Sequence, residues 1–373
     1  MEWQTQKYLL SGRTLDELTR EFAIKASHYP ALGVVMLNYD QIASDMTQAI
    51  CRECRALILS DDFQTIASRS FPKFFNMGEP NGADIEAGFD WTDFAAQEKL
   101  DGTLICLYHW RGAWQIATKG RADASGQVNI NPITFAELTR KTAGEQCGSW
   151  EAFCEPLNPD VSYSFELTGP LNRIIVAYPQ HELRLLAAWD KNTQEELNTR
   201  GLESPVPIVN AYPLSEIADI VDYLNRFGPH ELEGAVLADR NGIRLKVKNA
   251  AYLLAARAVS SVASPRRQLE MLLADQYDDI APLLPTVARQ EVDRLKDALA
   301  TFRETVLTTY AAISNTPEQK DFAQKALPFP YSGLLFQLRK GEEWTALMQK
   351  THPDRLLEWM GVAATDEAAA EES

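Results

Sequence analysis

The residue pattern changes sharply near position 250, and this change constrains the fold more than any other feature. Before it, short runs rich in β-branched and aromatic residues dominate, whereas after it apolar residues recur at helical spacing. Short turns that contain glycine, such as Arg111-Gly112 and Arg240-Asn241-Gly242, join several runs and predict hairpins. Strands are expected at 32–39, 54–60, 103–110, 114–119, 161–167, 173–178, 184–190, 232–239 and 243–248. The pattern predicts an α+β fold with antiparallel sheets, not the strand–helix alternation of a parallel sheet.

Helices are expected in both parts of the chain. In the first part they cover 13–26, 133–143, 149–156 and 214–227. In the second part they cover 250–263, 266–276, 286–313, 317–326, 333–339, 341–350 and 353–360. The 373 residues therefore divide into an α+β domain over 1–250 and an all-helical domain over 251–361. The Ala- and Glu-rich stretch 362–373 has no apolar face to bury, so we expect an acidic, disordered tail there.

The composition is ordinary for a globular protein, with 45% hydrophobic and 24% charged residues. No apolar run approaches the roughly 20 residues that span a bilayer, and the first residues do not form a signal peptide. We therefore expect a cytoplasmic monomer with no membrane partner. The net charge of −16 argues against a nucleic-acid partner, but a locally basic groove would still be compatible with one.

The five cysteines are expected to be reduced thiols. An odd number in a chain of this length does not suggest a disulfide framework. Cys51 and Cys54 form one C-x-x-C, but no second pair of cysteines or histidines completes a zinc site.

Lys99 stands at a turn and is a candidate reactive residue. The segment Glu98-Lys99-Leu100-Asp101-Gly102-Thr103 ends one apolar run and precedes another, so a lysine ends one strand and an Asp-Gly turn leads into the next. Alone, K-x-D-G is a weak signal, because a hairpin turn with a surface lysine has the same sequence.

Charged residues further along the chain are candidate partners for this lysine. Glu166 and Glu233 are carboxylates set in apolar strands. Lys246 and Lys248 lie two apart on one strand, so both ammonium groups project from the same face. Taken singly, each of these residues reads as an ordinary solvated strand side chain. Their joint occurrence in a fixed order favours a functional site over a set of unrelated surface residues.

These residue types fit the transfer of a nucleotide to a lysine. A lysine is protonated at neutral pH, with a pKa of about 10.4, and cannot attack until it loses that proton. Burial and nearby cations lower a lysine pKa, and we expect Lys246 and Lys248 to act on Lys99 in this way. The same pair would hold the α-phosphate of a nucleotide, with pyrophosphate as the leaving group. Glu233 would help to hold a divalent metal ion against the phosphates.

The order K-x-D-G, F-E, E-G-x-V and K-x-K resembles that of covalent nucleotidyl transferases, which include ATP-dependent DNA and RNA ligases and mRNA capping enzymes. Further elements narrow the resemblance to the bacteriophage RNA ligase 1 family, over residues 25 to 255. They are Glu53-Cys54-Arg55, Lys73-Phe74-Phe75-Asn76, Thr118-Lys119-Gly120, Phe165-Glu166, Pro170, Asn172-Arg173-Ile174, Ala177-Tyr178 and Tyr252. The helical end of the chain also suits this family.

The resemblance implies an ATP-dependent RNA ligase, a phosphodiester-forming enzyme that needs ATP and Mg²⁺ or Mn²⁺. Lys99 would carry AMP, pass it to the 5′-phosphate of an RNA end, and a 3′-hydroxyl would then displace it. The substrate would be RNA under repair, including broken tRNA, with the helical domain recognising it. The catalytic residues would be Lys99, Lys246, Lys248 and Glu233.

The resemblance also implies individual binding roles. Phe75 would stack on the adenine, and Glu166 would hold the ribose hydroxyls. Glu233 and, through a water molecule, Asp101 would hold the metal ion. The nucleotide-binding residues would be Arg55, Lys73, Phe75, Asp101, Gly102, Lys119, Glu166, Glu233, Lys246, Lys248 and Tyr252.

Two positions depart from the family pattern, and two alternatives to an RNA ligase remain. Ala56 replaces a glycine, and Leu37 stands where the family can show a tyrosine. A DNA ligase or capping guanylyltransferase would usually append a β-barrel, which the helical pattern after residue 255 does not favour. A binding protein that has lost catalysis is disfavoured by the joint retention of the lysines and Glu233.

Overall fold

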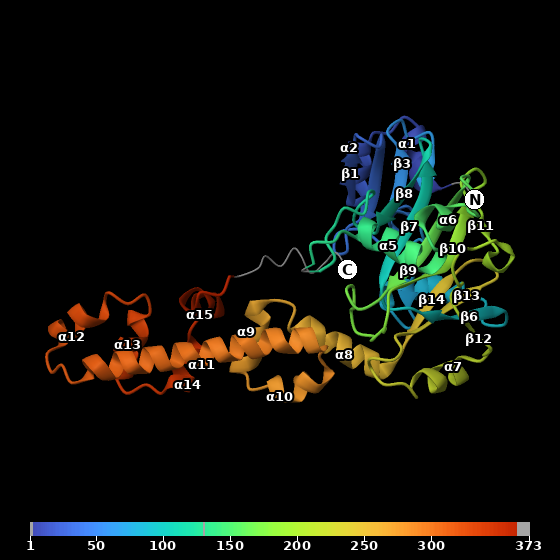
Figure 1. The fold of residues 1–373 in the computed structure, drawn as a ribbon. Helices are drawn as coiled ribbons and strands as arrows, with labels where there is room; N and C mark the ends of the chain where they lie inside the picture. Colours follow the sequence, from blue (N-terminus) through green and yellow to red (C-terminus); the bar gives the residue numbers. More distant parts are fainter. Residues whose placement is uncertain (1–2, 130, 364–373) are drawn as a thin grey trace. The chain divides into compact units, whose positions relative to one another are not determined.

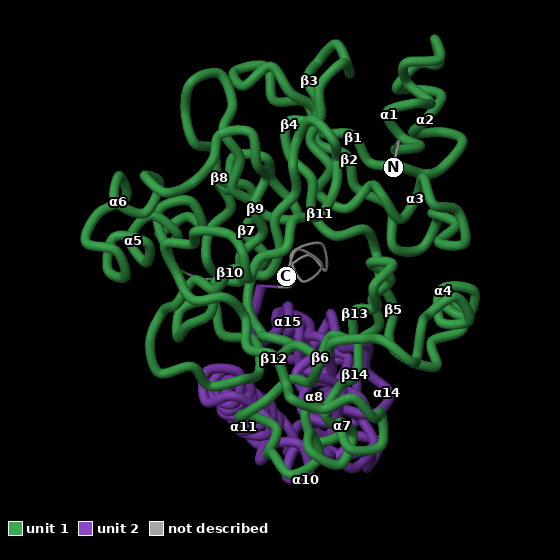
Figure 2. The backbone as a smooth tube through the Cα atoms, turned by 90° about the vertical axis from the view of Figure 1, so that its right-hand side faces the viewer, with its two compact units in different colours: residues 1–252 green, residues 253–373 purple. Residues whose placement is uncertain are grey.

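The computed structural model describes residues 3–129 and 131–363 and divides into two compact units, 1–252 and 253–373 (Figure 2). The sequence predicted a domain boundary after residue 250. Most of the predicted tail, residues 364–373, lies outside the described residues. No helix in the described ranges is long and apolar enough to span a membrane.

The first unit contains three sheets, which confirms the predicted α+β class (Figure 1). The N-terminal sheet has the order β1 (Ile24–Tyr29), β2 (Val34–Tyr39), β3 (Leu57–Ser60) and β4 (Ile66–Ser68). The central sheet has the order β11 (Glu196–Leu197), β10 (Glu182–Asp190), β9 (Val161–Thr168), β7 (Thr103–Trp110) and β8 (Ala113–Thr118). The third, here called the lysine sheet, has the order β12 (Ala211–Tyr212), β6 (Phe94–Lys99), β13 (Gly234–Asp239), β14 (Arg244–Lys248) and β5 (Phe75–Asn76).

Seven α-helices lie wholly within the first unit among the described residues. They are α1 (Gln4–Leu10), α2 (Leu15–Phe22), α3 (Ala49–Glu53), α4 (Ala83–Ala87), α5 (Phe135–Cys147), α6 (Trp150–Cys154) and α7 (Ile217–Leu224). Helix α7 covers one face of the lysine sheet, where Ile220 packs with Leu245 and Val247 of β14. Because side chains alternate along a strand, this burial turns Lys246 and Lys248 to the opposite face, as the sequence predicted.

The described part of the second unit is all helical, also as predicted. Helix α8 (Ala250–Ser261) crosses into it, and the 29-residue helix α11 (Thr286–Ser314) runs along the shorter helices (Figure 1). The shorter helices are α9 (Pro265–Leu273), α10 (Tyr277–Ile280), α12 (Gln319–Ala326), α13 (Ser332–Arg339), α14 (Trp344–Lys350) and α15 (Pro353–Met360). Phe302 of α11, Leu335 of α13 and Leu356 of α15 are members of one buried core.

Both predicted hairpins form. Arg111 and Gly112, with φ of 49° and 83°, make the two-residue turn between β7 and β8. Positive φ at both turn positions matches the right-handed twist of the flanking strands, which is why glycine is favoured there. Strands β13 and β14 pair antiparallel around the turn that contains Gly242, whose φ is 81°.

Two local predictions are wrong, and one alternative reading is excluded. Residues 173–178 form a loop, because the amides of Ile175 and Val176 bond to the Asp101 carboxylate and not to a neighbouring strand. The helix predicted over 13–26 ends at Phe22, where Ala23 takes a left-handed φ of 52° and β1 begins. The alternative reading of the Lys99 turn, a hairpin with a surface lysine, is excluded because β6 and β7 belong to different sheets.

Candidate active site

Lys99 lies at the last position of β6, beside the point where Glu233 leads into β13. In the pairing of the lysine sheet, both Lys99 and Lys248 lie opposite Gly234. Gly234 cannot be replaced easily, because a Cβ there would lie 2.1 Å from the Val247 carbonyl oxygen. The strand register therefore brings the two lysines to either side of Glu233.

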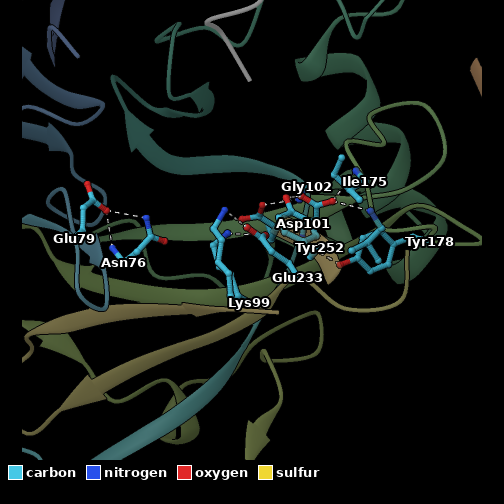
Figure 3. A network of polar contacts seen from close by, with 12 residues as sticks. Asn76, Glu79, Lys99, Asp101, Gly102, Ile175, Tyr178, Glu233 and Tyr252 are labelled. Atoms are coloured by element: carbon cyan, nitrogen blue, oxygen red, sulfur yellow. Dashed lines mark hydrogen bonds and ion pairs between the residues drawn. The ribbon is translucent and has the colours of Figure 1, made fainter. Parts of the chain in front are cut away.

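Glu233 forms ion pairs with Lys99 (Figure 3) and with Lys248. Its Oε2 lies 2.6 Å from Lys99 Nζ, and its Oε1 lies 2.9 Å from Lys248 Nζ. The carboxylate is 3% exposed, so it is a buried charge compensated by two cations. Lys248 also lies against the Tyr252 ring, with Nζ 5.1 Å from the ring centroid.

The protonation of Lys99 differs from the prediction. Burial lowers the pKa of Lys99, but Glu233, Glu166 and Asp101 together raise it above its ordinary value. The expectation that Lys246 and Lys248 lower the Lys99 pKa is therefore wrong for this structure. The reason is that the three carboxylates outweigh burial. Lys248 is itself paired with Glu233.

Lys246 is the lysine whose pKa is lowered, to about 6. Burial is the largest cause, and Lys73, Lys99 and Arg55 add cationic repulsion. Its Nζ lies 4.7 Å from the centroid of the Phe74 ring. In the described residues Lys246 has no ion-pair partner within 4 Å, so it is available to an anionic ligand.

Glu166 approaches the turn from β9 of the central sheet. Its Oε1 accepts a hydrogen bond of 3.1 Å from the Gly102 amide. Burial raises the pKa of Glu166 to about 8, with Lys99 acting in the opposite direction. A carboxyl group that keeps its proton near neutral pH can donate as well as accept a hydrogen bond, which suits a ligand hydroxyl.

Asp101 fixes the turn that follows Lys99 (Figure 3). Its Oδ2 accepts from the amides of Ile175 and Val176, each at 2.8 Å, and its Oδ1 accepts from the Tyr252 hydroxyl at 2.8 Å. Its own amide donates to the Tyr178 hydroxyl at 3.0 Å. Both carboxylate oxygens thus have partners in the protein, which supports the predicted role in orienting the turn more than a role at a metal ion.

The donor set near Lys99 fits a divalent metal ion only in part. Among residues 3–129 and 131–363, no group of three or more His, Cys, Asp or Glu could hold one. Glu233 offers carboxylate oxygens, which Mg²⁺ and Mn²⁺ prefer, although in this structure both are paired with Lys99 and Lys248. The remaining ligands would have to be waters and oxygens of a bound phosphate. Cys51 and Cys54 are buried and form no disulfide.

The other predicted nucleotide contacts stay predictions. Arg55 donates to the Phe71 carbonyl at 3.5 Å, and Lys73 Nζ lies 5.4 Å from the Phe75 ring centroid. Phe75 is 1% exposed and packs on Gly82, where a Cβ would lie 2.4 Å away, so its ring is covered in this conformation. Lys119 directly follows the edge strand β8 of the central sheet.

Sequence reasoning did not assign a role to Tyr178, Tyr39 or Asn249. Tyr39 lies beside Lys73, whose Nζ is 6.0 Å from its ring centroid. Asn249 is buried, its amide donates to the Glu233 carbonyl, and its Oδ1 accepts from Ala251 at the start of α8. An Asn directly before a helical run is an N-cap signal, so this role could have been inferred.

The backbone at Ala56 shows why the family pattern has a glycine at this position. Its φ is 55°, in the left-handed region that favours glycine and costs another residue about 1–2 kcal/mol. Its amide donates to Asn38 Oδ1 at 2.8 Å, which helps to hold the chain in this conformation. The substitution therefore leaves the backbone path after Arg55 intact.

Gly102 yields a stability prediction. A Cβ at this position would lie 2.3 Å from the Leu167 carbonyl oxygen, so Gly102→Ala forces β9 and the Lys99 turn apart. We expect the free energy of unfolding to fall by about 1–3 kcal/mol, measured by urea denaturation. Gly120→Ala is the control, because no atom lies within 4 Å of a Cβ there, and it should change stability by less than about 0.5 kcal/mol. Equal stability of the two variants would contradict the packing argument.

Among known proteins, the sequence is similar to RNA ligases. A family model described as RNA ligase matches residues 53–252, more than half of the chain. A putative bifunctional polynucleotide kinase/RNA ligase of Autographa californica nuclear polyhedrosis virus is 26% identical over 362 residues, which are 93% of this chain and 52% of that protein. The chain thus spans about half the length of that relative. An RNA ligase of Rhodothermus phage RM378 is 25% identical over 378 residues, with 82% of this chain and 84% of that protein covered.

Solved structures also match. An archaeal ATP-dependent RNA ligase, form 1, has a TM-score of 0.48 and 17% identity over 79% of this chain and 82% of that chain.

Proposed function

The chain belongs to the bacteriophage RNA ligase 1 family, and from this premise we propose that it joins the 5′-phosphate and 3′-hydroxyl ends of RNA at the expense of ATP. The observation that carries the proposal is the Lys99–Glu233–Lys248 cluster around a buried Glu233, next to Lys246, which has no ion-pair partner within 4 Å among the described residues. A lysine held beside a carboxylate and several cations suits attack on a phosphate. The described part of the second unit is all helical, which disfavours a DNA ligase or a capping guanylyltransferase, since these usually carry a β-barrel there.

In the first step, Lys99 Nζ forms a bond to the α-phosphorus of ATP and the bond to the β-phosphate oxygen breaks, releasing pyrophosphate. Glu233 Oε2, 2.6 Å from Nζ, is the acceptor for the proton that Lys99 must lose. Lys246 binds the α-phosphate and compensates the charge that develops on its oxygens. The second oxygen of Glu233 is bonded to Lys248, which keeps the carboxylate oriented during this step.

In the second step, an oxygen of the RNA 5′-phosphate attacks the phosphorus of lysyl-AMP, the P–N bond breaks, and Lys99 regains a proton. In the third step, the 3′-hydroxyl attacks the activated 5′-phosphate, loses its proton, and AMP leaves. A bound Mg²⁺ or Mn²⁺ would neutralise phosphate charge in these steps, with Glu233 as its candidate protein ligand. The finer proposal is that the RNA is broken tRNA and that the enzyme acts in RNA repair.

The test uses the full chain with α-³²P-labelled ATP and Mg²⁺, followed by denaturing electrophoresis. We expect a labelled protein band with ATP and none with labelled GTP. A 5′-phosphorylated RNA should then be joined, and a DNA of the same sequence should be joined poorly. No label from ATP would overturn the mechanism, label from GTP alone would favour the capping alternative, and equal joining of DNA would overturn the RNA specificity.

Lys246 gives a separate prediction on proton uptake. Because its pKa is about 6, Lys246 is largely neutral just above neutral pH, and a polyphosphate bound beside it should raise that pKa. ATP binding should therefore take up about one proton, measured by calorimetry in buffers with different ionisation enthalpies. Lys246→Met should remove this uptake, whereas Lys141→Met on the exposed side of α5 should keep it. Uptake that persists in Lys246→Met would contradict the assignment.

A further inference from the structure

The second unit contains a cavity of about 270 Å³ that has no part in the steps above. It lies beside α11 and is lined by two cations, two carboxylates and two aromatic rings. These residues are Lys296, Arg303, Asp275, Asp278, Tyr277 and Trp344. The cavity thus combines an aromatic wall with both signs of charge, a set typical of sites for ligands that are partly planar and partly ionic.

The two cations occupy one side of α11. Lys296 and Arg303 are seven residues apart, which is two helical turns or about 10 Å along the axis. Both side chains are exposed, and neither has an ion-pair partner within 4 Å in the described part of the chain. Lys296 Nζ lies 5.3 Å from the centroid of the Tyr277 ring, which keeps it over the cavity. In a chain with a net charge of −16, such cations are the groups that an anion can use.

The other lining groups narrow the ligand class. Trp344 is half-buried at the start of α14, beside Phe302 at a centroid distance of 6.1 Å, so its ring is anchored but not covered. Asp275 and Asp278 are exposed carboxylates, which accept hydrogen bonds from amino groups and repel a bare phosphate. A ligand with an aromatic face, amino groups and flanking phosphates would satisfy all three features, and a nucleotide of single-stranded RNA has them.

We propose that this cavity binds one unpaired nucleotide of the RNA substrate. The base stacks on Trp344, its amino group bonds to Asp275 or Asp278, and Lys296 and Arg303 contact the adjacent phosphates. The inference rests on the proposed function, since it names a place where the RNA being joined is held. It assigns RNA recognition to particular residues of the helical unit and leaves the chemistry at Lys99 unchanged.

The test measures binding of the full-length protein to a fluorescein-labelled, 5′-phosphorylated oligoribonucleotide at several salt concentrations. Lys296→Gln combined with Arg303→Gln should raise the Kd by about tenfold and reduce the slope of log K against log salt by about 1.4, the value for two phosphate contacts on a single strand. Labelling of Lys99 by ATP should remain at the wild-type level. The matched control is Arg294→Glu, which changes the net charge by the same amount on the same helix.

Arg294 is exposed and absent from the cavity lining, so its reversal should change the salt slope little. The proposal is overturned if the double variant and Arg294→Glu have the same Kd and the same salt slope. If wild type binds RNA but takes no label from ATP, the proposed function fails while the binding comparison still decides the cavity.

Trp344 provides an independent readout. Trp344→Leu should raise the Kd between about fivefold and a hundredfold with an unchanged salt slope, because stacking is lost and no phosphate contact is removed. Trp344→Phe should retain most of the affinity, since a ring remains. Thermal unfolding and Lys99 labelling check that each variant is folded. Equal affinities of Trp344→Leu and Trp344→Phe would overturn base stacking at this position.

Discussion

Lys99→Ala is expected to abolish labelling of the protein by α-³²P-ATP and to reduce joining of 5′-phosphorylated RNA by at least about a thousandfold, as removal of a covalent nucleophile does elsewhere. Joining of RNA that already carries a 5′-adenylate should fall by less than about tenfold, because that step needs positioning and charge neutralisation but no lysyl-AMP. The two reactions are compared by gel electrophoresis of the RNA products.

The control for this variant is Lys141→Ala, which removes an exposed lysine from α5 at a side-chain exposure of 61%. It should retain both labelling and joining. Label that persists in Lys99→Ala would contradict the assignment of the nucleophile. Loss of joining with both RNA substrates, in a protein that still binds ATP, would instead show that Lys99 is needed for positioning and not only for nucleophilic attack.

The parts of the fold that sequence predicted well are those that depend on local patterns. Strand β14 alternates charged and apolar residues, so its buried face against α7 and the opposite position of its lysines could be inferred directly. The Arg111-Gly112 turn has positive φ at both positions, and the glycine in its sequence indicates such a turn. The helices of the second unit have long apolar periodicities, and their predicted ranges fall close to the observed ones.

The parts that were missed depend on contacts between distant segments. The K-x-D-G sequence does not reveal that β6 and β7 enter different sheets, because pairing is decided by the partner strands β13 and β9. The loop that contains Ile175 has the β-rich composition of a strand. Its Ile175 amide, however, donates a hydrogen bond to the Asp101 carboxylate, 74 positions earlier in the chain. No local pattern predicts that competition.

The charges of the site also depend on contacts between distant segments, which local sequence does not reveal. Lys246 and Lys248 are equivalent in sequence, since both lie on one face of β14. In the structure Lys248 is paired with Glu233, whereas the pKa of Lys246 falls to about 6 through burial and neighbouring cations. The two lysines therefore differ: Lys248 is a counter-ion of Glu233, and in the proposed function Lys246 is the group that binds the α-phosphate. The pKa of Lys99 is raised because Glu233, Glu166 and Asp101 together outweigh the lowering effect of burial.

Glu233→Gln should separate the effect of Glu233 on the Lys99 pKa from its effect on the orientation of the Lys99 amine. The side chain keeps its size but loses the charge that raises the Lys99 pKa, while burial continues to lower it. The neutral, nucleophilic fraction of Lys99 should therefore rise. Orientation of the amine, pairing of Lys248 and the candidate metal ligand are lost at the same time. We expect the rate of Lys99 adenylation at saturating ATP to fall by about a hundredfold, because positioning and charge compensation outweigh the gain in free amine.

The pH dependence of that rate identifies the cause. In the wild type, Lys99 is protonated well above neutral pH, so the single-turnover adenylation rate should rise by about tenfold per pH unit through the neutral and mildly alkaline range. In Glu233→Gln the rise should level off at a lower pH, because the Lys99 pKa is lower. Glu98→Gln is the control: Glu98 precedes Lys99 but bonds to Asn210 and Arg184, so the rate should change by less than about threefold and the profile should not move. A Glu233→Gln profile identical to that of the wild type would mean that another group sets the protonation of Lys99.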